Sequence, residues 1–271
     1  MLEWVNRFVK GLPLVGPGLR RVRQRLRPAT RQRSTEEIFT SIFQRHAWGG
    51  TDSVSGPGSE ASQTARLVAN LRTLIDEHEI RSLLDIPCGD FHWMQRVNLH
   101  GLSYVGADIV RELVVQNQRY AANGITFRHM DLLAYPLPKV DLILCRDCLV
   151  HFSFDDIFTA LENLCASGSR YLLTTTFPSR PINVPIATGK WRTLNLEQAP
   201  FRFPPPIAVL EEGCTEGGGE YADKSMGLWR LSDVEISLVN ARNGRDFPHA
   251  ATSAGRLKRL LIHPPLRVRP I

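Results

Sequence analysis

The sequence lacks any apolar run long enough to cross a bilayer, which takes about 20 consecutive apolar residues. A transmembrane protein is therefore not expected. Near the amino terminus, Pro13, Pro17 and a cluster of arginines interrupt the apolar residues, so we do not expect a signal peptide either. The five cysteines are odd in number and lie mostly in apolar stretches, which favours reduced thiols in a cytoplasmic chain. Cys145 and Cys148 form a C-x-x-C pair, but without a second pair we interpret them as core residues.

Acidic residues are scarce at both ends of the chain. Residues 1–33 carry a net charge of +8 and residues 251–271 carry +5, whereas residues 34–250 carry −7. An acidic body with basic ends argues against a nucleic-acid groove across the centre of the protein, and we find no zinc-finger or RNA-binding motif. The sequence therefore predicts no nucleic-acid partner.

The chain also lacks the G-x-G-x-x-G pattern that a dinucleotide site needs. In place of that glycine pattern the chain has the stretch LLDIPCGD at 83–90, in which Asp85 interrupts an apolar run and Gly89 follows four positions later. This pattern predicts a buried parallel strand that ends in a tight turn, where glycine lets the backbone approach a ligand. The carboxylates of Asp85 and Asp90 are unsuited to a pyrophosphate and suited to a cationic ligand.

Two further apolar runs end in a carboxylate. Residues 102–107 lead to Asp108, and residues 125–130 lead to Asp131. An acid at the end of the second strand can accept hydrogen bonds from both hydroxyls of a ribose. Three successive strands that end in acids predict a nucleoside-type cofactor, and the acidic turn favours a cationic one. S-adenosylmethionine combines a sulfonium, an ammonium group, a ribose diol and an adenine.

With these residues the chain resembles the class I S-adenosylmethionine-dependent methyltransferases, strongly over 63–177 and more weakly over 38–234. Its W-G-G stretch at 48–50, S-x-S-G-x-G-S at 53–59 and D-x-P-C-G-D-F-x-W-M at 85–94 are similar to a subgroup of small bacterial members. The resemblance implies an α/β fold with a Rossmann-like, doubly wound, mostly parallel sheet and an antiparallel last hairpin. It implies S-adenosyl-L-methionine as cofactor and the following binding residues: Asp85, Pro87, Cys88, Gly89, Asp90, Trp93, Asp108, Ile109, Met130, Asp131, Arg146, Ser55 and Ser59.

The pattern of elements divides the chain into four parts. We expect a basic, partly amphipathic extension at 1–33, a lid helix with a Gly/Ser loop at 34–62, a methyltransferase domain at 63–240 and a basic tail at 241–271. Seven prolines interrupt 178–206, so we interpret 178–226 as an insertion on the acceptor side. Periodicity and capping signals predict helices at 34–46, 63–79, 91–97, 111–122 and 154–165. Strand signals predict a fourth and fifth strand at 140–144 and 171–177, a hairpin of 207–210 with 227–231 around a mobile glycine-rich loop, and a further element at 257–262.

The basic extension admits two interpretations. Residues 1–19 place apolar side chains on one helix face, and an arginine cluster follows, which is typical of a peripheral anchor at the inner face of a membrane. The alternative is a poorly ordered basic extension without a partner.

The fourth strand ends in the stretch CRDCLVHF at 145–152, which carries the candidate catalytic residues. Strand ends face the ligand crevice of an open parallel sheet, so we expect Arg146, Asp147 and His151 where the methyl acceptor meets the sulfonium. Histidine suits the role of general base because its ordinary pKa is near neutral. Asp147 could orient the imidazole, while Arg146 and Trp191 help to shape the acceptor pocket. The alternative is that His151 caps a helix and that Arg146 and Asp147 form a structural ion pair.

The stretch CRDC also differs from the Asn/Asp-Pro-Pro-Tyr/Phe motif of enzymes that methylate DNA base amines or protein glutamine, so we do not expect those acceptors. Asp147 and His151 could hold magnesium with a further carboxylate, but the acids are already explained by the cofactor, and we predict no metal. The sequence thus favours O-methylation of a small-molecule or carbohydrate hydroxyl. The alternatives are N-methylation of a small amine or lipid headgroup, and a cofactor-binding adaptor without catalysis.

Overall fold

The structure is a computed structural model that describes residues 33–134 and 136–242. The predictions for the basic extension, for the tail and for an element at 257–262 lie outside the described residues. Within those two ranges, no helix combines the length and the apolar character that crossing a membrane requires.

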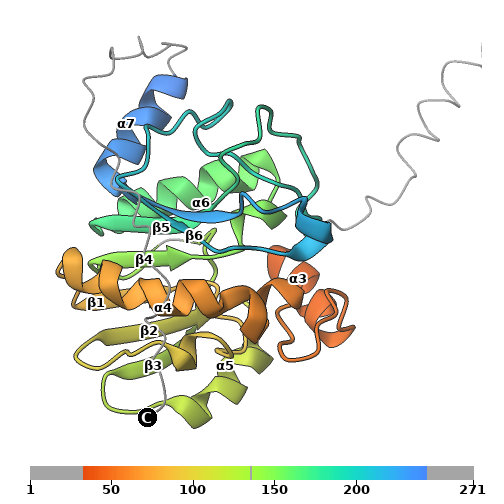
Figure 1. The fold of residues 1–271 in the computed structure, drawn as a ribbon, viewed down its shortest axis with the longest axis vertical. Helices are drawn as coiled ribbons and strands as arrows, with labels where there is room; N and C mark the ends of the chain where they lie inside the picture. The colour runs from red at the N-terminus through yellow and green to blue at the C-terminus, as the bar shows by residue number, and fades with distance from the viewer. Residues whose placement is uncertain (1–32, 135, 243–271) are drawn as a thin grey trace, which may run out of the picture. The chain divides into compact units, whose positions relative to one another are not determined.

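A seven-stranded sheet in the order β3-β2-β1-β4-β5-β7-β6 forms the centre of the described chain (Figure 1). The first five of these strands pair in parallel, and β7 runs antiparallel to both β5 and β6. This arrangement confirms the predicted Rossmann-like sheet with an antiparallel last hairpin. The strands are β1 (Ser82–Asp85), β2 (Ser103–Asp108), β3 (Ile125–His129), β4 (Leu142–Cys145), β5 (Tyr171–Thr176), β6 (Ala208–Glu211) and β7 (Ser225–Arg230).

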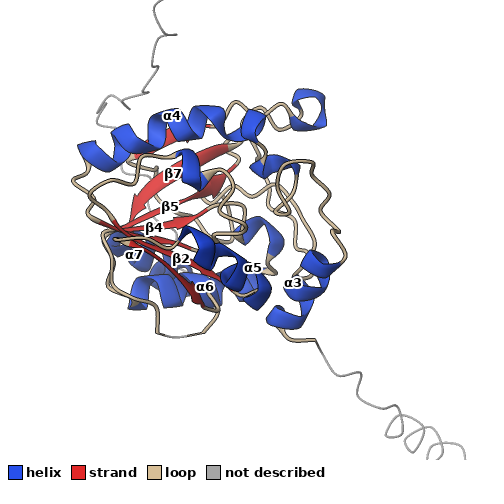
Figure 2. Cartoon of the chain, turned by 90° about the horizontal axis from the view of Figure 1, so that it is seen from below, coloured by secondary structure: helices blue, strands red, loops and turns tan. Residues whose placement is uncertain are grey.

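The helices cover both faces of the sheet (Figure 2). α4 (Ala61–Glu77) turns a stripe of Leu67, Leu71 and Leu74 onto one face, where it joins Leu83 of β1 and Leu142 of β4 in a hydrophobic core. The second core lies on the other face and includes apolar side chains of α6 (Phe154–Ala166) and α7 (Leu231–Arg242). Because both faces are covered, the central strands read as continuous apolar runs.

Two further helices are α3 (Thr35–Gln44), which lies beside the carboxyl ends of the strands, and α5 (Arg111–Asn117), which packs on β2 and the edge strand β3. α3 precedes the Gly/Ser loop, and α5 follows β2. α6 begins after the segment that follows β4. Ser153 caps its first turn, because its side chain accepts a hydrogen bond at 3.1 Å from the backbone N–H of Asp156. Such a cap stabilises a helix by about 1 kcal/mol.

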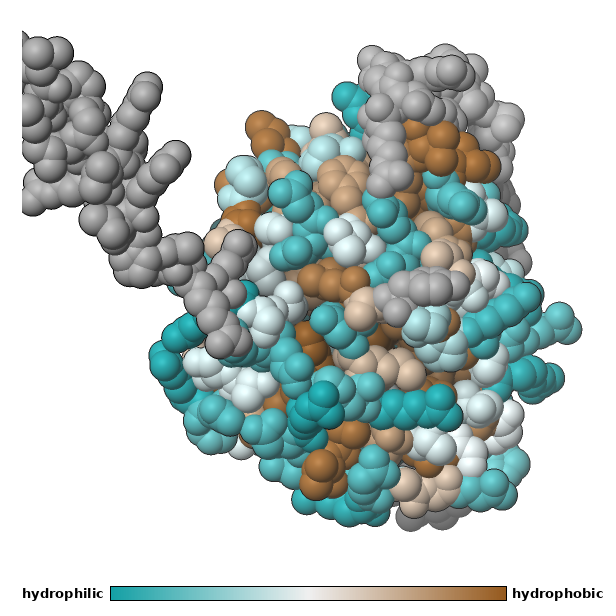
Figure 3. All heavy atoms as spheres, turned by 180° about the vertical axis from the view of Figure 1, so that it is seen from behind, coloured by the Kyte–Doolittle hydropathy of each residue, from teal (hydrophilic) through white to brown (hydrophobic). Residues whose placement is uncertain are grey.

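The surface carries apolar side chains in separate groups. On the face that Figure 3 shows, hydrophobic residues lie between hydrophilic ones. The large apolar side chains exposed in the described ranges include Val115 on α5, Ile182 and Trp191 in the proline-rich segment and Ile236 on α7.

One local prediction was wrong and one helix was missed. The helix expected at 91–97 is only a 3-10 turn at Met94–Arg96, because Phe91 takes a φ of +61° and buries its ring against Tyr104 and Phe127. The helix α7 was not predicted. The segment 211–225, predicted as a mobile loop, has the buried side chains of Glu212 and Lys224 near its two ends, and its mobility stays a prediction.

Candidate active site

A pocket opens at the carboxyl ends of β1, β2 and β4, between these strand ends, α3 and the Gly/Ser loop, residues 48–59. Every residue that the sequence predicted to bind the cofactor lines it, and so do Asp147 and His151. The lining also includes Trp48 of the W-G-G stretch, and Phe39 and Phe152, which the sequence did not single out. Phe39 lies on α3 and Phe152 follows the 3-10 turn at Leu149–His151, and in sequence both resemble core residues.

The acids at the ends of β1 and β2 are both buried. Asp85 accepts a hydrogen bond at 2.7 Å from the hydroxyl of Tyr104, a neighbour on β2. Burial raises the pKa of Asp85 to about 7, although this hydrogen bond opposes the shift. Asp108 accepts hydrogen bonds from the backbone N–H groups of Gly89 at 3.0 Å and Val110 at 2.9 Å. Burial raises the pKa of Asp108 to about 6 against the effect of these two donors.

Gly89 occupies a position where a side chain cannot fit. Its φ is +55°, a conformation that favours glycine, and a Cβ would lie 2.2 Å from Oγ of Ser55. The sequence predicted a close approach of the backbone at this glycine. The structure shows that the group approaching it is the Gly/Ser loop.

The Gly/Ser loop is attached to the acidic turn through Asp90. The carboxylate of Asp90 accepts hydrogen bonds from Oγ of Ser53 at 3.1 Å and from the backbone N–H of Val54 at 3.0 Å. It also accepts one from the backbone N–H of His92 at 3.1 Å. Asp90 therefore holds the loop over the pocket, a use that the sequence did not predict.

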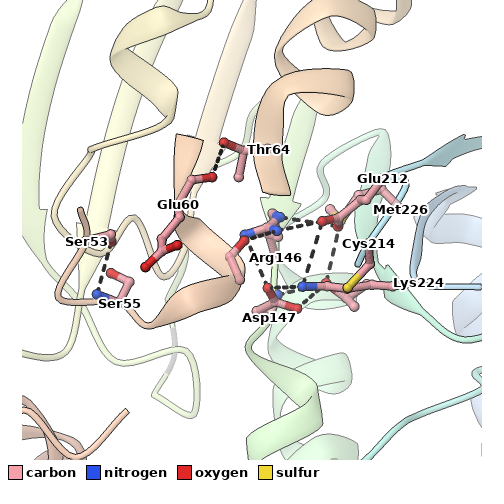
Figure 4. A network of polar contacts seen from close by, with 12 residues as sticks. Ser53, Ser55, Glu60, Thr64, Arg146, Asp147, Glu212, Cys214, Lys224 and Met226 are labelled. Carbon is pink, nitrogen blue, oxygen red and sulfur yellow. Dashed lines mark hydrogen bonds and ion pairs between the residues drawn. The ribbon is translucent and has the colours of Figure 1, made fainter. Parts of the chain in front are cut away.

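Arg146, the first residue after β4, lies in a buried network of charges (Figure 4). Its guanidinium donates to both carboxylate oxygens of Glu212, at 3.2 and 2.5 Å, and to the backbone carbonyl of Gly58 at 2.7 Å. It also lies 3.2 Å from a carboxylate oxygen of Asp147 and 5.5 Å from the ring centroid of Trp93. Burial alone disfavours its charge, but Glu212 and Asp147 raise the pKa of Arg146 above its usual value.

Asp147 shares this network through Lys224, whose Nζ donates to its carboxylate at 2.6 Å and lies 3.7 Å from Glu212. Burial opposes the ionisation of Asp147, but Lys224 and Arg146 outweigh it and hold the pKa of this carboxyl well below its usual range. Burial likewise opposes the charge of Lys224, and the two carboxylates raise its pKa. The sequence missed Glu212 and Lys224, because charged residues beside a glycine-rich stretch resemble a solvated loop.

His151 lies in a 3-10 turn at Leu149–His151 that precedes α6. Nδ1 of its ring is 2.9 Å from the backbone carbonyl oxygen of Lys190, and the ring packs on Trp48 with centroids 4.9 Å apart. Burial lowers the pKa of His151 below 6.5, against the effect of the Lys190 carbonyl.

Two expectations about the neighbours of His151 are corrected by these contacts. Asp147 was expected to orient the imidazole, but the group at Nδ1 is the Lys190 carbonyl and Asp147 is engaged by Lys224 and Arg146. Trp191 was expected to shape the acceptor pocket. Its ring instead packs edge-on against Tyr221 and Phe177, and it is not part of the pocket lining. Over the described ranges, no group of three or more His, Cys, Asp or Glu side chains is arranged to hold a metal ion.

The sheet order and a pocket at the acidic strand ends define the class I methyltransferase fold. Residues 83–167 match the family described as "Methyltransferase domain", and this segment includes β1 to β4, Asp85, Asp108 and His151. The match covers 85 of the 271 residues, and they include the centre of the sheet. No curated protein matches the chain.

Solved structures with a similar arrangement are methyltransferases of several kinds. The 1,6-didemethyltoxoflavin N1-methyltransferase of Burkholderia thailandensis, solved with 1,6-didemethyltoxoflavin and S-adenosylhomocysteine, has 16% identity and a TM-score of 0.51, covering 72% of this chain and 86% of that chain. Human N-acetylserotonin methyltransferase, solved with S-adenosylmethionine, has 17% identity and a TM-score of 0.47, covering 73% and 60%. The magnesium protoporphyrin IX methyltransferase of Synechocystis has 16% identity and a TM-score of 0.43, covering 58% and 83%. At 16% identity, the likeness to the Burkholderia enzyme shows the fold alone.

Proposed function

We propose that this protein is an S-adenosylmethionine-dependent methyltransferase that methylates a hydroxyl group of a small-molecule or carbohydrate acceptor. One observation carries the proposal. The same pocket joins two buried acids at the ends of β1 and β2 to a histidine whose pKa is lowered by burial. The acids suit a cationic nucleoside, and the histidine suits the removal of a hydroxyl proton.

The residues at the first two strand ends fit S-adenosylmethionine. Asp108 keeps lone pairs beyond those that Gly89 and Val110 use, and these can accept hydrogen bonds from the ribose hydroxyls. Asp85 supplies a buried carboxylate for a positively charged ammonium group. The absence of a side chain at Gly89 keeps the turn narrow enough for the Gly/Ser loop to cover it. When bound, the cofactor supplies an electrophilic methyl group on its sulfonium.

His151 is the general base in this proposal. Because its pKa lies below 6.5, the imidazole is neutral at pH 7 and can accept a proton. The neutral form that donates from Nδ1–H to the Lys190 carbonyl leaves Nε2 as the acceptor nitrogen. As the acceptor oxygen attacks the methyl carbon, its proton passes to Nε2. Asp147 is a poor base by comparison, because Lys224 and Arg146 stabilise its ionised form.

The proposal is tested by incubating the purified protein with a cell extract and S-adenosylmethionine labelled in its methyl group. We expect label in the small-molecule fraction, attached to oxygen. Label on nitrogen would instead favour an amine or a lipid headgroup as acceptor. Binding of the cofactor with no transfer to any fraction of the extract would contradict an enzymatic role and leave a cofactor-binding adaptor.

The affinity for S-adenosylmethionine should rise with pH between about 6 and 7. The raised pKa values mean that Asp108 and Asp85 are protonated at low pH, and each becomes a carboxylate as the pH passes about 6 and about 7. A carboxylate attracts the cationic cofactor, whereas the neutral acid does not. Calorimetric titrations at pH 5.5 and 7.5 measure the difference. Asp85→Asn should reduce this pH dependence, and an equal dependence in that variant would exclude Asp85 as its source.

A further inference from the structure

Four charged side chains, three of them buried and the fourth, Asp147, partly buried, tie together three segments that are far apart in the sequence. Arg146 and Asp147 follow β4, Glu212 follows β6, and Lys224 precedes β7, while the carbonyl of Gly58 belongs to the Gly/Ser loop (Figure 4). Arg146, Glu212 and Lys224 expose 5%, 2% and 5% of their surfaces. The two cations contact the two anions, and the carboxylate of Glu216 lies beside them and also favours the charge of Arg146.

The contact with the loop is close as well as polar. Arg146 donates to the Gly58 carbonyl, and the neighbouring charged side chains leave little room for a side chain at Gly58. A Cβ on Gly58 would lie 3.1 Å from a carboxylate oxygen of Glu216, 3.2 Å from Nζ of Lys224 and 3.4 Å from a carboxylate oxygen of Asp147. The β6–β7 side of the sheet and the Gly/Ser loop are therefore packed against each other through these charges.

The Gly/Ser loop can leave the pocket only if this contact breaks. Val54, Ser55 and Ser59 of the loop line the pocket, so the loop covers the space that a ligand must enter. Asp90 anchors the middle of the loop, and Arg146 anchors it at Gly58. Gly50 and Gly56 have φ values of +105° and +96°, and such positions can absorb a change of backbone direction.

We propose that Glu212 and Lys224 are positioning residues that act through Arg146 and control the opening of the Gly/Ser loop over the bound cofactor. This inference rests on the proposed binding of S-adenosylmethionine. Glu212 fixes the guanidinium of Arg146 with two hydrogen bonds, so that the remaining N–H donors of Arg146 point to Gly58 and Asp147. Lys224 neutralises Asp147, which would otherwise compete for Arg146. The hairpin thereby sets the rate at which the cofactor site opens, a step that limits turnover in many enzymes.

The test is the rate at which S-adenosylhomocysteine leaves the full-length protein, measured by stopped-flow tryptophan fluorescence, since Trp48 and Trp93 line the pocket. The paired substitution Glu212→Gln with Lys224→Met removes one charge of each sign and keeps similar volumes. We expect release to become about tenfold faster or more, as for the loss of a charge-assisted hydrogen bond. Hydrogen exchange of the amides at 53–60 should accelerate similarly, while amides of β1 and β4 remain protected.

Arg230→Gln is the matched control, because it breaks an exposed ion pair with Asp233 at the other end of β7. It should leave the release rate unchanged, and Lys224→Arg should retain most of the parent behaviour. If the paired variant does not fold, Glu212→Asp keeps the charge and shortens its reach to Arg146. An unchanged release rate in a folded variant with only a lower melting temperature would show that the network is structural. If the parent protein does not bind S-adenosylhomocysteine, the proposed function fails first, and this inference with it.

Discussion

His151→Ala is expected to lower the rate of methyl transfer by about 10²–10⁴-fold, the range that positioned acid–base catalysis supplies. The cofactor affinity should hardly change, because the imidazole is proposed to act on the acceptor. At saturating S-adenosylmethionine the parent rate should rise with pH through one ionisation below the usual range of histidine, since burial lowers the pKa of His151 and only the neutral ring accepts a proton. Initial rates between pH 4.5 and 8 measure this limb, which should be absent in the variant.

Two further substitutions separate catalysis from packing. His151→Asn places an amide N–H where Nδ1 lies and can still donate to the Lys190 carbonyl, so a variant that folds normally but remains slow assigns the loss to the missing base. His100→Ala removes an exposed histidine outside the pocket and should turn over like the parent. Normal turnover of His151→Ala with its acceptor would show that the histidine is structural and that the base lies elsewhere.

Asp108→Ala should weaken binding of S-adenosylmethionine by about 1–3 kcal/mol, or roughly 5- to 150-fold, through the loss of charge-assisted hydrogen bonds. The substitution also leaves the N–H groups of Gly89 and Val110 without their carboxylate acceptor, so the turn after β1 should loosen. Calorimetry at pH 7.5, where the carboxylate is ionised, measures the change in affinity.

Asp108→Asn distinguishes the two effects. Its amide oxygen can still accept from the turn, whereas the negative charge is lost. Asp76→Ala on the exposed side of α4 is the control for removing an acid and should bind normally. An unchanged affinity in Asp108→Ala would remove this residue from the ribose role.

The sequence predicted the half of the site that is built by local patterns. The apolar runs that end in Asp85 and Asp108 form the largely buried strands β1 and β2, and because neighbouring parallel strands end at the same edge, these two acids had to lie together. Gly89 was predicted by the same logic, since the turn needs a residue that tolerates a positive φ.

The other half depends on contacts between distant segments. Glu212 lies 66 residues after Arg146, and Lys224 lies 77 residues after Asp147, so no spacing along the chain relates them. The orienting group of His151 is a backbone carbonyl, which every residue carries and no motif reveals. The helix at 91–97 was overpredicted for a similar reason, since the burial of Phe91 between rings on β2 and β3 outweighs its local preference.

β7 is the last of the described strands in the sequence but lies between β5 and β6 in the sheet, so one part of the site is synthesised later than the rest. A nascent chain that has reached residue 177 already contains β1 to β5 and both acids of the nucleoside end, but Arg146 and Asp147 still lack Glu212 and Lys224. At ribosomal rates of about 5–20 residues per second, β7 is complete about 3–10 seconds later. Unpaired charges favour water over burial, so the end of β4 stays hydrated during that interval. The nucleoside end of the pocket can thus form on the ribosome before the end that holds the loop.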